Sequence, residues 1–146
     1  MPPHNFKDFP ELSNGQMDEF YFSSPHKQIL EDFTAKVIKV HDGDTMTVRW
    51  SERDFDFPVR LAFINAPELN ETGGHSSRDW MKSRVEGKEV DILIDPNNRV
   101  GRFGRIIGDV IEGGISVNRE SLDNGKSLNF GVLSFEQEML KMRLDK

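Results

Sequence analysis

The chain has 146 residues, of which 36% are hydrophobic and 30% charged, a balance typical of one globular domain and too apolar for general disorder. It contains no cysteine, which excludes a disulfide scaffold, a thiolate zinc site and a cysteine nucleophile. No apolar run reaches the roughly 18 residues of a membrane span, and the N-terminus lacks a secretory signal pattern, so we expect a cytoplasmic protein with no membrane partner.

The net charge of −6 argues against tight nonspecific coating of nucleic acid. Residues 1–33 carry two basic and six acidic side chains, a charge of −4, so the rest of the chain carries only −2. A local arginine cluster in that part can therefore still bind a phosphate group.

Residues 1–33 are interpreted as an N-terminal extension of a domain formed by residues 34–146. Four prolines interrupt any periodic pattern in the extension, yet its six aromatic residues are too many for a free tail. Either these aromatics pack on the domain as a strap, or the extension is an arm that docks on a partner protein or on a second copy of the chain. We favour the strap, because buried aromatic residues usually serve packing.

The pattern after the extension predicts strands and helices in alternating groups. Strands rich in β-branched residues are predicted at 33–40, 45–50 and 55–64, with Pro58 at an edge or bulge, and further strands at 89–95 and 105–111. Helices are predicted at 76–86, at 116–124 and from Ser134 onward. This order predicts an α+β fold, mainly β, built on a five-stranded OB-type barrel with about three helices.

Three clusters of polar residues carry the candidate chemistry, and the first is the turn Asp42-Gly43-Asp44-Thr45. Asp-Gly pairs are common in hairpin turns that need a positive φ, and this is the simplest interpretation. Alternatively, Asp44 offers its carboxylate to a hard divalent cation, provided that other ligands converge on the same point.

The second cluster lies at the end of the third predicted strand and just beyond it. Regular alternation would place Arg60 and Ile64 on one side of the strand and Asn65 on the other. Arg60 is either a surface residue or a bidentate phosphate ligand. Glu68 is either an exposed loop acid or a general base.

The third cluster is Arg99-Val100-Gly101-Arg102-Phe103-Gly104-Arg105, with three arginines and two glycines in seven residues. It is either a solvated basic loop or a phosphate-binding loop in which glycine permits close approach.

Taken together, the clusters resemble the staphylococcal-nuclease-like (thermonuclease) family in residue type, order and spacing. The resemblance covers about two-thirds of the chain and rests on Asp42-Gly43-Asp44-Thr45, Arg60-Leu61, Ala66-Pro67-Glu68, Phe103-Gly104-Arg105 and Val117-Asn118. It implies an OB-fold barrel and a calcium-dependent nuclease, a metal-binding hydrolase that acts on DNA and RNA and leaves 3′-phosphates.

The resemblance also implies which residues would hold the cation. It makes Asp44 a calcium ligand, residue 65 the second side-chain ligand and the carbonyl of Ala66 a backbone ligand. Asp42 and Thr45 would not bind the ion directly but would surround the residues that do.

Further residues of the same motifs would act on the substrate. Arg60 would bind the scissile phosphate, Glu68 would activate the attacking water, and Arg105 would stabilise the charged transition state. Phe103 stands where the family often has a tyrosine, and Arg102 is the candidate replacement for the lost hydroxyl as a substrate ligand.

The sequence departs from the family pattern at Asn65, where the family usually has aspartate. The amide keeps one oxygen for the ion but lacks the charge, so we expect calcium affinity lower by about one to three orders of magnitude. Asn65 marks a tolerated natural variant, a non-catalytic descendant, or a change introduced to silence an enzyme.

The alternative to an attenuated nuclease is a non-catalytic OB-fold module that binds single-stranded nucleic acid or a protein partner. Such a module needs exposed aromatics among basic residues, and Trp50, Phe55 and Phe57 are the candidates. Packing in the barrel core explains the same three aromatics more simply.

Overall fold

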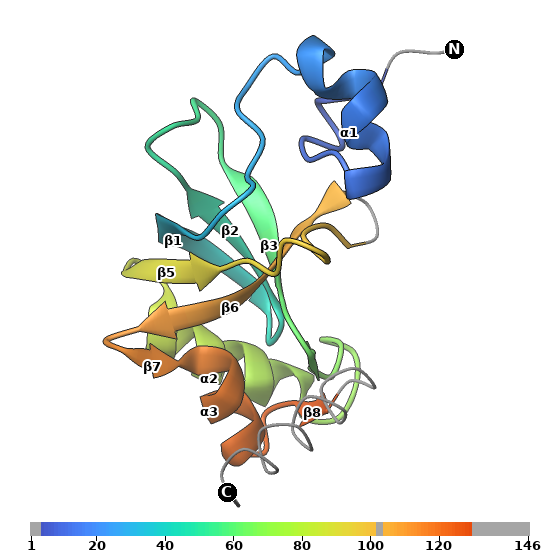
Figure 1. Cartoon of the computed structure of the whole chain (residues 1–146). Coiled ribbons are helices and arrows are strands. Elements are labelled where there is room, and N and C mark those ends of the chain that lie inside the picture. Colours follow the sequence, from blue (N-terminus) through green and yellow to red (C-terminus); the bar gives the residue numbers. More distant parts are fainter. Residues whose placement is uncertain (1–3, 102–103, 130–146) are drawn as a thin grey trace, which may run out of the picture.

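The computed structural model of the protein describes residues 4–101 and 104–129. Its central feature is a barrel of five strands: β1 (Phe33–Asp42), β2 (Thr45–Arg49), β3 (Phe57–Leu61), β5 (Glu89–Leu93) and β6 (Ile106–Glu112). The strands follow the order β3-β2-β1-β5-β6, and a parallel pairing of β3 with β6 closes the ring (Figure 1). The mainly β, OB-type barrel predicted from the sequence is confirmed.

The long strand β1 makes closure feasible because it pairs with two neighbours. It is antiparallel to β5 through its first residues and antiparallel to β2 along most of its length. Its register with β2 shifts between Val37 and Lys39 and again between Val40 and Asp42. Such bulges bend a strand and increase its twist, which curls the sheet toward closure.

The prediction of a single third strand over residues 55–64 is wrong, because the strand is shorter than predicted. β3 ends at Leu61, and β4 (Ile64–Asn65) is a separate short strand. Between them Phe63 adopts a φ of +63°, in the left-handed region, and interrupts the alternation of the strand. Ile64 is therefore buried like Leu61 instead of sharing the outward side of Arg60.

Two helices lie together at one end of the sheet (Figure 1). They are α2 (Gly74–Val85) and α3 (Val117–Asp123), which confirm the helices predicted near 76–86 and 116–124. The remaining strands are short: β7 (Ile115–Ser116) pairs with β6, and β8 (Leu128–Asn129) pairs with β4. The helix predicted from Ser134 lies outside the described residues. No helix in the described ranges is long and apolar enough to cross a lipid bilayer.

The barrel core contains apolar side chains from all five strands and from α2. Met81 and Val85 of α2 are fully buried, as the apolar face of that helix predicts. Trp50 and Phe57 are 7% and 2% exposed, and Phe55 packs partly buried against the same cluster. These three aromatics serve the core, which is the simpler of the two explanations given for them.

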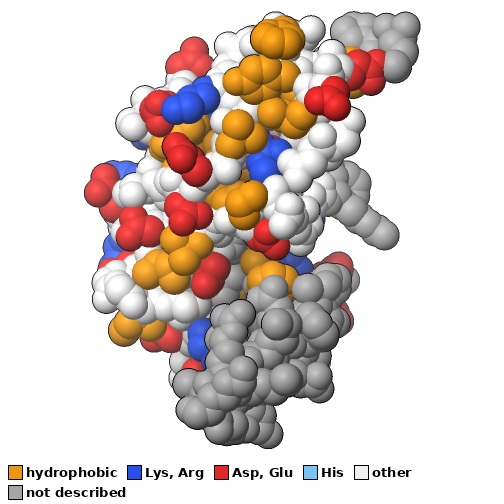
Figure 2. Space-filling view, viewed as in Figure 1, with side chains coloured by type: hydrophobic (Ala, Val, Ile, Leu, Met, Phe, Trp, Pro, Cys, Tyr) orange, Lys and Arg blue, Asp and Glu red, His pale blue; other side chains and the backbone are white. Residues whose placement is uncertain are grey.

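The N-terminal extension contains a helix, α1 (Asn14–Phe20), and a 3-10 turn, η1 (Tyr21–Ser23), that the sequence analysis did not predict. Some of the extension is packed on the barrel, since Leu12 and Ile29 are 0% and 1% exposed. Some of it is open to solvent, since Phe22 is 96% exposed. Figure 2 shows apolar side chains gathered on the surface over this part of the molecule.

Candidate functional site

The centre of the candidate site is the carboxylate of Asp44, in the short turn between β1 and β2. Its Oδ2 accepts a hydrogen bond from the N–H of Ala66 at 2.8 Å and lies 3.3 Å from Nη2 of Arg60. Its Oδ1 accepts a hydrogen bond from the Thr45 hydroxyl at 3.2 Å. Asp44 therefore joins the turn to β3 and to the segment that follows β4.

Asp42 supplies a second carboxylate to the same corner, and its Oδ1 accepts a hydrogen bond from the N–H of Asp44 at 3.0 Å. Burial raises the pKa of Asp44 to about 6, helped by a hydrogen bond to Asp42 and opposed by Arg60 and the Ala66 N–H. The ionised form of Asp44 is therefore costly here, and a bound cation would offset that cost.

Two guanidinium groups face this corner from neighbouring strands. Arg60 on β3 donates from Nη1 to the carbonyl of Leu61 at 2.8 Å, which fixes the plane of its guanidinium beside Asp44. Arg105 immediately precedes β6 and donates from Nη1 to Oγ1 of Thr45 at 3.5 Å. Burial lowers the pKa of Arg60, the charge of Asp44 raises it, and the nearby charge of Arg105 lowers it again.

The pairing of β3 with β6 explains why residues so far apart in sequence meet. Arg60 lies opposite Ile107 in that parallel pair and opposite Thr45 in the antiparallel pair with β2. Arg105 stands two residues before Ile107, so the strand pairings bring Thr45, Arg60 and Arg105 close together on one part of the barrel.

Gly43 occupies this turn for a reason that differs from the expected one. The predicted hairpin turn is confirmed, since the antiparallel strands β1 and β2 flank it, but Gly43 is absent from the described glycines with positive φ. The segment of α2 instead passes so close that a Cβ on Gly43 would overlap Oγ of Ser77 and lie 2.6 Å from Cβ of Ala66. Gly43 thus allows α2 to pack directly behind Asp44.

Asn65 and Glu68 lie on either side of Ala66, and both side chains are exposed. The N–H of Glu68 donates to Oε1 of Glu71 at 2.8 Å, which turns the chain toward the start of α2. Among the described residues, no hydrogen bond or ion pair joins either exposed side chain to Asp44.

The structure therefore brings most of the predicted site residues together: Asp42, Asp44, Thr45, Arg60, Arg105 and the backbone of Ala66. It leaves the side chains of Asn65 and Glu68 exposed beside them. Arg102 and Phe103, predicted to bind substrate, lie outside the described residues.

The candidate metal donors are all oxygen atoms, from the carboxylates of Asp42 and Asp44, the amide of Asn65 and the carbonyl of Ala66. Oxygen donors of this kind suit Ca²⁺ and other hard cations. Within the described ranges there is no group of three or more His, Asp and Glu side chains that could hold a metal ion. A cation here would therefore depend on the amide and the carbonyl to complete its ligands.

Asn118 has a structural role, as a buried hydrogen-bonding residue, that the sequence motifs do not reveal. It is 6% exposed, and its Oδ1 accepts from the N–H of Val110 at 3.0 Å. Its Nδ2 donates to the carbonyls of Ala62 at 2.9 Å and Gly108 at 3.2 Å. Asn118 thus anchors α3 to β6 and to the residue that follows β3. Its motif, Val117-Asn118, supports the family resemblance but does not reveal these contacts.

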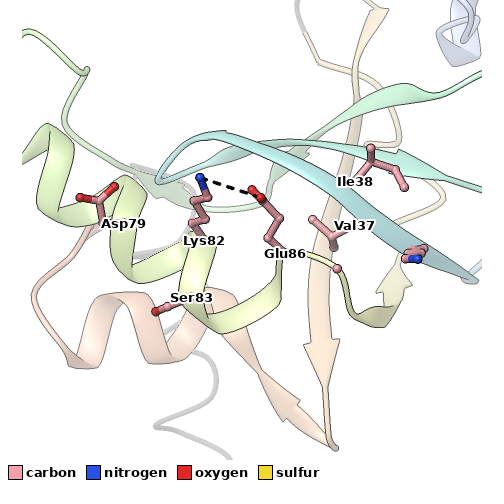
Figure 3. A pocket seen from close by; sticks show the side chains of 8 residues that line it. Val37, Ile38, Asp79, Lys82, Ser83 and Glu86 are labelled. Carbon is pink, nitrogen blue, oxygen red and sulfur yellow. Dashed lines mark ion pairs between the residues drawn. The ribbon is translucent and has the colours of Figure 1, made fainter.

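An open groove of about 780 Å³ lies away from this cluster, between β1 and α2 (Figure 3). Lys82 and Glu86 point toward one another along it, with 4.0 Å between Nζ and Oε1. Lys36 and Asp79 also line the groove, so charges of both signs alternate there. Such a groove does not attract a polyanion along its length, and the candidate site remains at Asp44.

The chain is similar in sequence to known nucleases. The family model described as "Staphylococcal nuclease homologue" matches residues 58–141. An "Uncharacterized endonuclease" of Escherichia coli is 38% identical over 101 residues, which are 68% of this chain and 61% of that protein.

Two further relatives carry nuclease names. A "Micrococcal nuclease" of Shigella flexneri is 33% identical over 79 residues, 54% of this chain and 42% of that protein. A "Probable staphylococcal-like nuclease CAN3" of Oryza sativa subsp. japonica is 26% identical over 101 residues, 69% of this chain and 24% of that protein. The chain thus spans less than two-thirds of the length of these relatives.

Proposed function

The chain belongs to the staphylococcal nuclease homologue family, and from this premise we propose that it is a calcium-dependent nuclease that hydrolyses phosphodiester bonds of DNA and RNA. The observation that carries the proposal is the meeting of the Asp44 carboxylate with the guanidiniums of Arg60 and Arg105 in one half-buried corner. The names of the relatives in E. coli, S. flexneri and rice point to the same class of reaction.

The two guanidiniums would stabilise the transition state. Attack on a phosphodiester builds negative charge on the non-bridging oxygens, and fixed donors aimed at that charge lower the barrier. Arg60 is held in place by the Leu61 carbonyl and by Asp44, so it is oriented before a substrate arrives. Arg105 would approach the same phosphate from the start of β6.

Asp44, Asn65 and the carbonyl of Ala66 would hold Ca²⁺, with Asp42 behind them. The bound ion would supply charge neutralisation and polarisation of a phosphoryl oxygen. The oxygen donor set and the raised pKa of Asp44 support this assignment. Glu68, exposed in the adjoining loop, would accept the proton of the attacking water and orient that water for in-line attack.

A cleavage assay on a fluorescent single-stranded oligonucleotide tests the proposal. Cleavage should require Ca²⁺, stop in EDTA and rise in the Asn65→Asp variant. In that background, Arg60→Ala or Arg105→Ala should lower the rate about 100-fold or more, because each removes a charged donor from the transition state. Arg49→Ala is the matched control, since Arg49 is an exposed arginine paired with Asp56 at 2.9 Å.

Cleavage that persists in EDTA, or that is indifferent to both arginine substitutions, would overturn this mechanism. Binding of the oligonucleotide without cleavage, by the chain and by its Asn65→Asp variant alike, would favour the non-catalytic OB-fold module instead.

A further inference from the structure

A buried ionic cluster joins the N-terminal extension to the barrel. The carboxylate of Glu11 contacts Nη2 of Arg53 through Oε1 and lies 3.2 Å from Nη2 of Arg99 through Oε2. The side chains of Glu11, Arg53 and Arg99 are 1%, 0% and 2% exposed. Charges so deeply buried are tolerated only when each is paired and hydrogen-bonded, so this cluster fixes its three elements relative to one another.

Arg99 is held almost entirely by the extension. Its Nε donates to the carbonyl of Ile29 at 2.7 Å, and its Nη1 donates to the carbonyl of Leu12 and to Oδ1 of Asn14, both at 3.0 Å. Asn14 in turn donates from Nδ2 to the carbonyl of Pro96 at 2.8 Å. The extension therefore holds Arg99, the first residue of the predicted phosphate-binding loop.

Backbone hydrogen bonds connect the segment that begins at Arg99 to the segment that contains Arg105. The N–H of Gly101 donates to the carbonyl of Arg105 at 2.8 Å, and the N–H of Ile107 donates to the carbonyl of Arg99 at 2.9 Å. Val100 and Ile106 form an antiparallel bridge between these two bonds. The described residues 99–101 and 104–107 thus form two paired arms, called here the Arg105 hairpin.

The extension also touches the second arm of the Arg105 hairpin directly. Gly104 has a φ of +67°, and a Cβ built on it would lie 2.9 Å from Cβ and 3.2 Å from the ring atom Cδ1 of Phe9. Phe9 therefore packs against the backbone of the residue that precedes Arg105.

From these contacts we propose that the N-terminal extension is a positioning element for Arg105. Through Glu11, Asn14 and Phe9 it fixes the Arg105 hairpin, and so sets where the guanidinium stands relative to Arg60. The inference rests on the proposed function, because it takes Arg105 to act on the phosphate. Glu11, Asn14 and Phe9 are thereby positioning residues that do not touch the substrate.

Hydrogen exchange of backbone amides tests the structural half of the proposal in the full chain. Glu11→Gln would leave two buried guanidiniums beside a neutral group and can unfold the chain, so the test uses Phe9→Ala and Asn14→Ala. The amides of Gly101 and Ile107 should exchange at least about tenfold faster in both variants, because their acceptors lie in the Arg105 hairpin. The internal reference is the amide of Val37 on β1, which donates to the carbonyl of Lys88 at 2.9 Å.

Cleavage kinetics in the Asn65→Asp background test the functional half. Phe9→Ala should lower kcat about tenfold and leave KM within about twofold, because a displaced Arg105 fails mainly in the transition state. When Arg105→Ala is already present, Phe9→Ala should have no further effect. Phe22→Ala, which removes the same ring from an exposed position of the extension, should change neither the kinetics nor the exchange.

Unchanged exchange at Gly101 and Ile107, or equal acceleration at Val37, would overturn the proposal. So would a loss of rate from Phe9→Ala that is just as large in the Arg105→Ala protein. If Arg60→Ala and Arg105→Ala themselves leave cleavage unchanged, the proposed function fails, while the exchange result still decides whether the extension holds the hairpin.

Discussion

At the scale of single residues, Asp44 is a carboxyl group whose ionised form the fold disfavours. In the unfolded chain its pKa is near 3.8, and in the folded chain burial raises the pKa to about 6. A proton on Asp44 therefore stabilises the folded state. That stabilisation is complete below pH 4 and is lost as the pH rises through 6.

Replacement of the Asp44 carboxyl by an amide should therefore raise the free energy of unfolding at a pH above 6. In EDTA at pH 8, Asp44→Asn should raise the free energy of unfolding by about 3 kcal/mol, because the amide avoids burial of a charge. The gain should shrink toward zero at pH 4. Urea unfolding at both pH values measures it, and Ca²⁺ should stabilise the parent protein but not the variant. A gain that is the same at pH 4 and pH 8 would contradict this account.

Asn65 is the residue at which a single charge should decide how tightly the proposed site binds Ca²⁺. Asn65→Asp adds a second charged ligand next to Ala66 and should tighten Ca²⁺ binding by about one to three orders of magnitude. Isothermal titration calorimetry measures the two affinities. Asn70→Asp adds the same charge at an exposed position of the same loop and should change the affinity little. Equal affinities in the parent and Asn65→Asp proteins would remove residue 65 from the proposed ligands.

At the scale of elements, the buried side chain of Asn118 joins α3 to the barrel through hydrogen bonds. Asn118→Ala leaves the N–H of Val110 and the carbonyl of Ala62 without their side-chain partner in a buried position. The expected loss is about 2–4 kcal/mol of unfolding free energy, since each unsatisfied buried group costs about 1–3 kcal/mol. Urea unfolding of the variant provides the measurement.

Asn124→Ala is the matched control for that substitution, because Asn124 is an exposed asparagine at the end of the same helix whose side chain donates to the carbonyl of Glu120 at 2.8 Å. It should cost less than about 1 kcal/mol. Similar losses from both substitutions would show that the buried bonds of Asn118 add nothing.

The elements that the sequence predicted well are those whose pattern is local. Alternating apolar residues mark β1, and the apolar face of Met81 and Val85 marks α2. The break after Leu61 was missed, because Phe63 reaches its left-handed φ through the fold and not through a residue type that favours it.

The short helix α1 was missed although a local signal was present. Ser13 and Gln16 have the spacing of a capping box, and Oε1 of Gln16 accepts from the N–H of Ser13 at 3.0 Å. The prolines on either side dominated the interpretation, and a seven-residue helix adds little periodic pattern of its own.

The candidate site likewise contains residues that sequence motifs identify and contacts that form only when the chain folds. Asp44, Arg60 and Arg105 were identified because their motifs occur in the order of a known family. The close contact of Ser77 with Gly43 and the burial of Glu11 could not be predicted, because both depend on segments that meet only in the folded chain.

At the scale of the whole molecule, the net charge of −6 separates local phosphate binding from general attraction to nucleic acid. Most of the net negative charge lies in the extension, and one of its carboxylates, Glu11, pairs internally with Arg53 and Arg99. The surface therefore offers no broad basic track in the described part of the chain, and binding should rest on a few guanidiniums around Asp44.

This distribution predicts a shallow salt dependence for binding to a single strand. With about two or three phosphate contacts, the slope of log K against log [KCl] should be about −1.4 to −2, at roughly −0.7 per contact. Fluorescence anisotropy in EDTA, where cleavage should be suppressed, measures the slope between about 50 and 200 mM KCl. Arg105→Ala should flatten it by about 0.7, since one contact is lost, whereas Arg49→Ala should leave it unchanged. A slope steeper than about −4 would show an extended basic surface and contradict this description of how the acidic chain binds a polyanion.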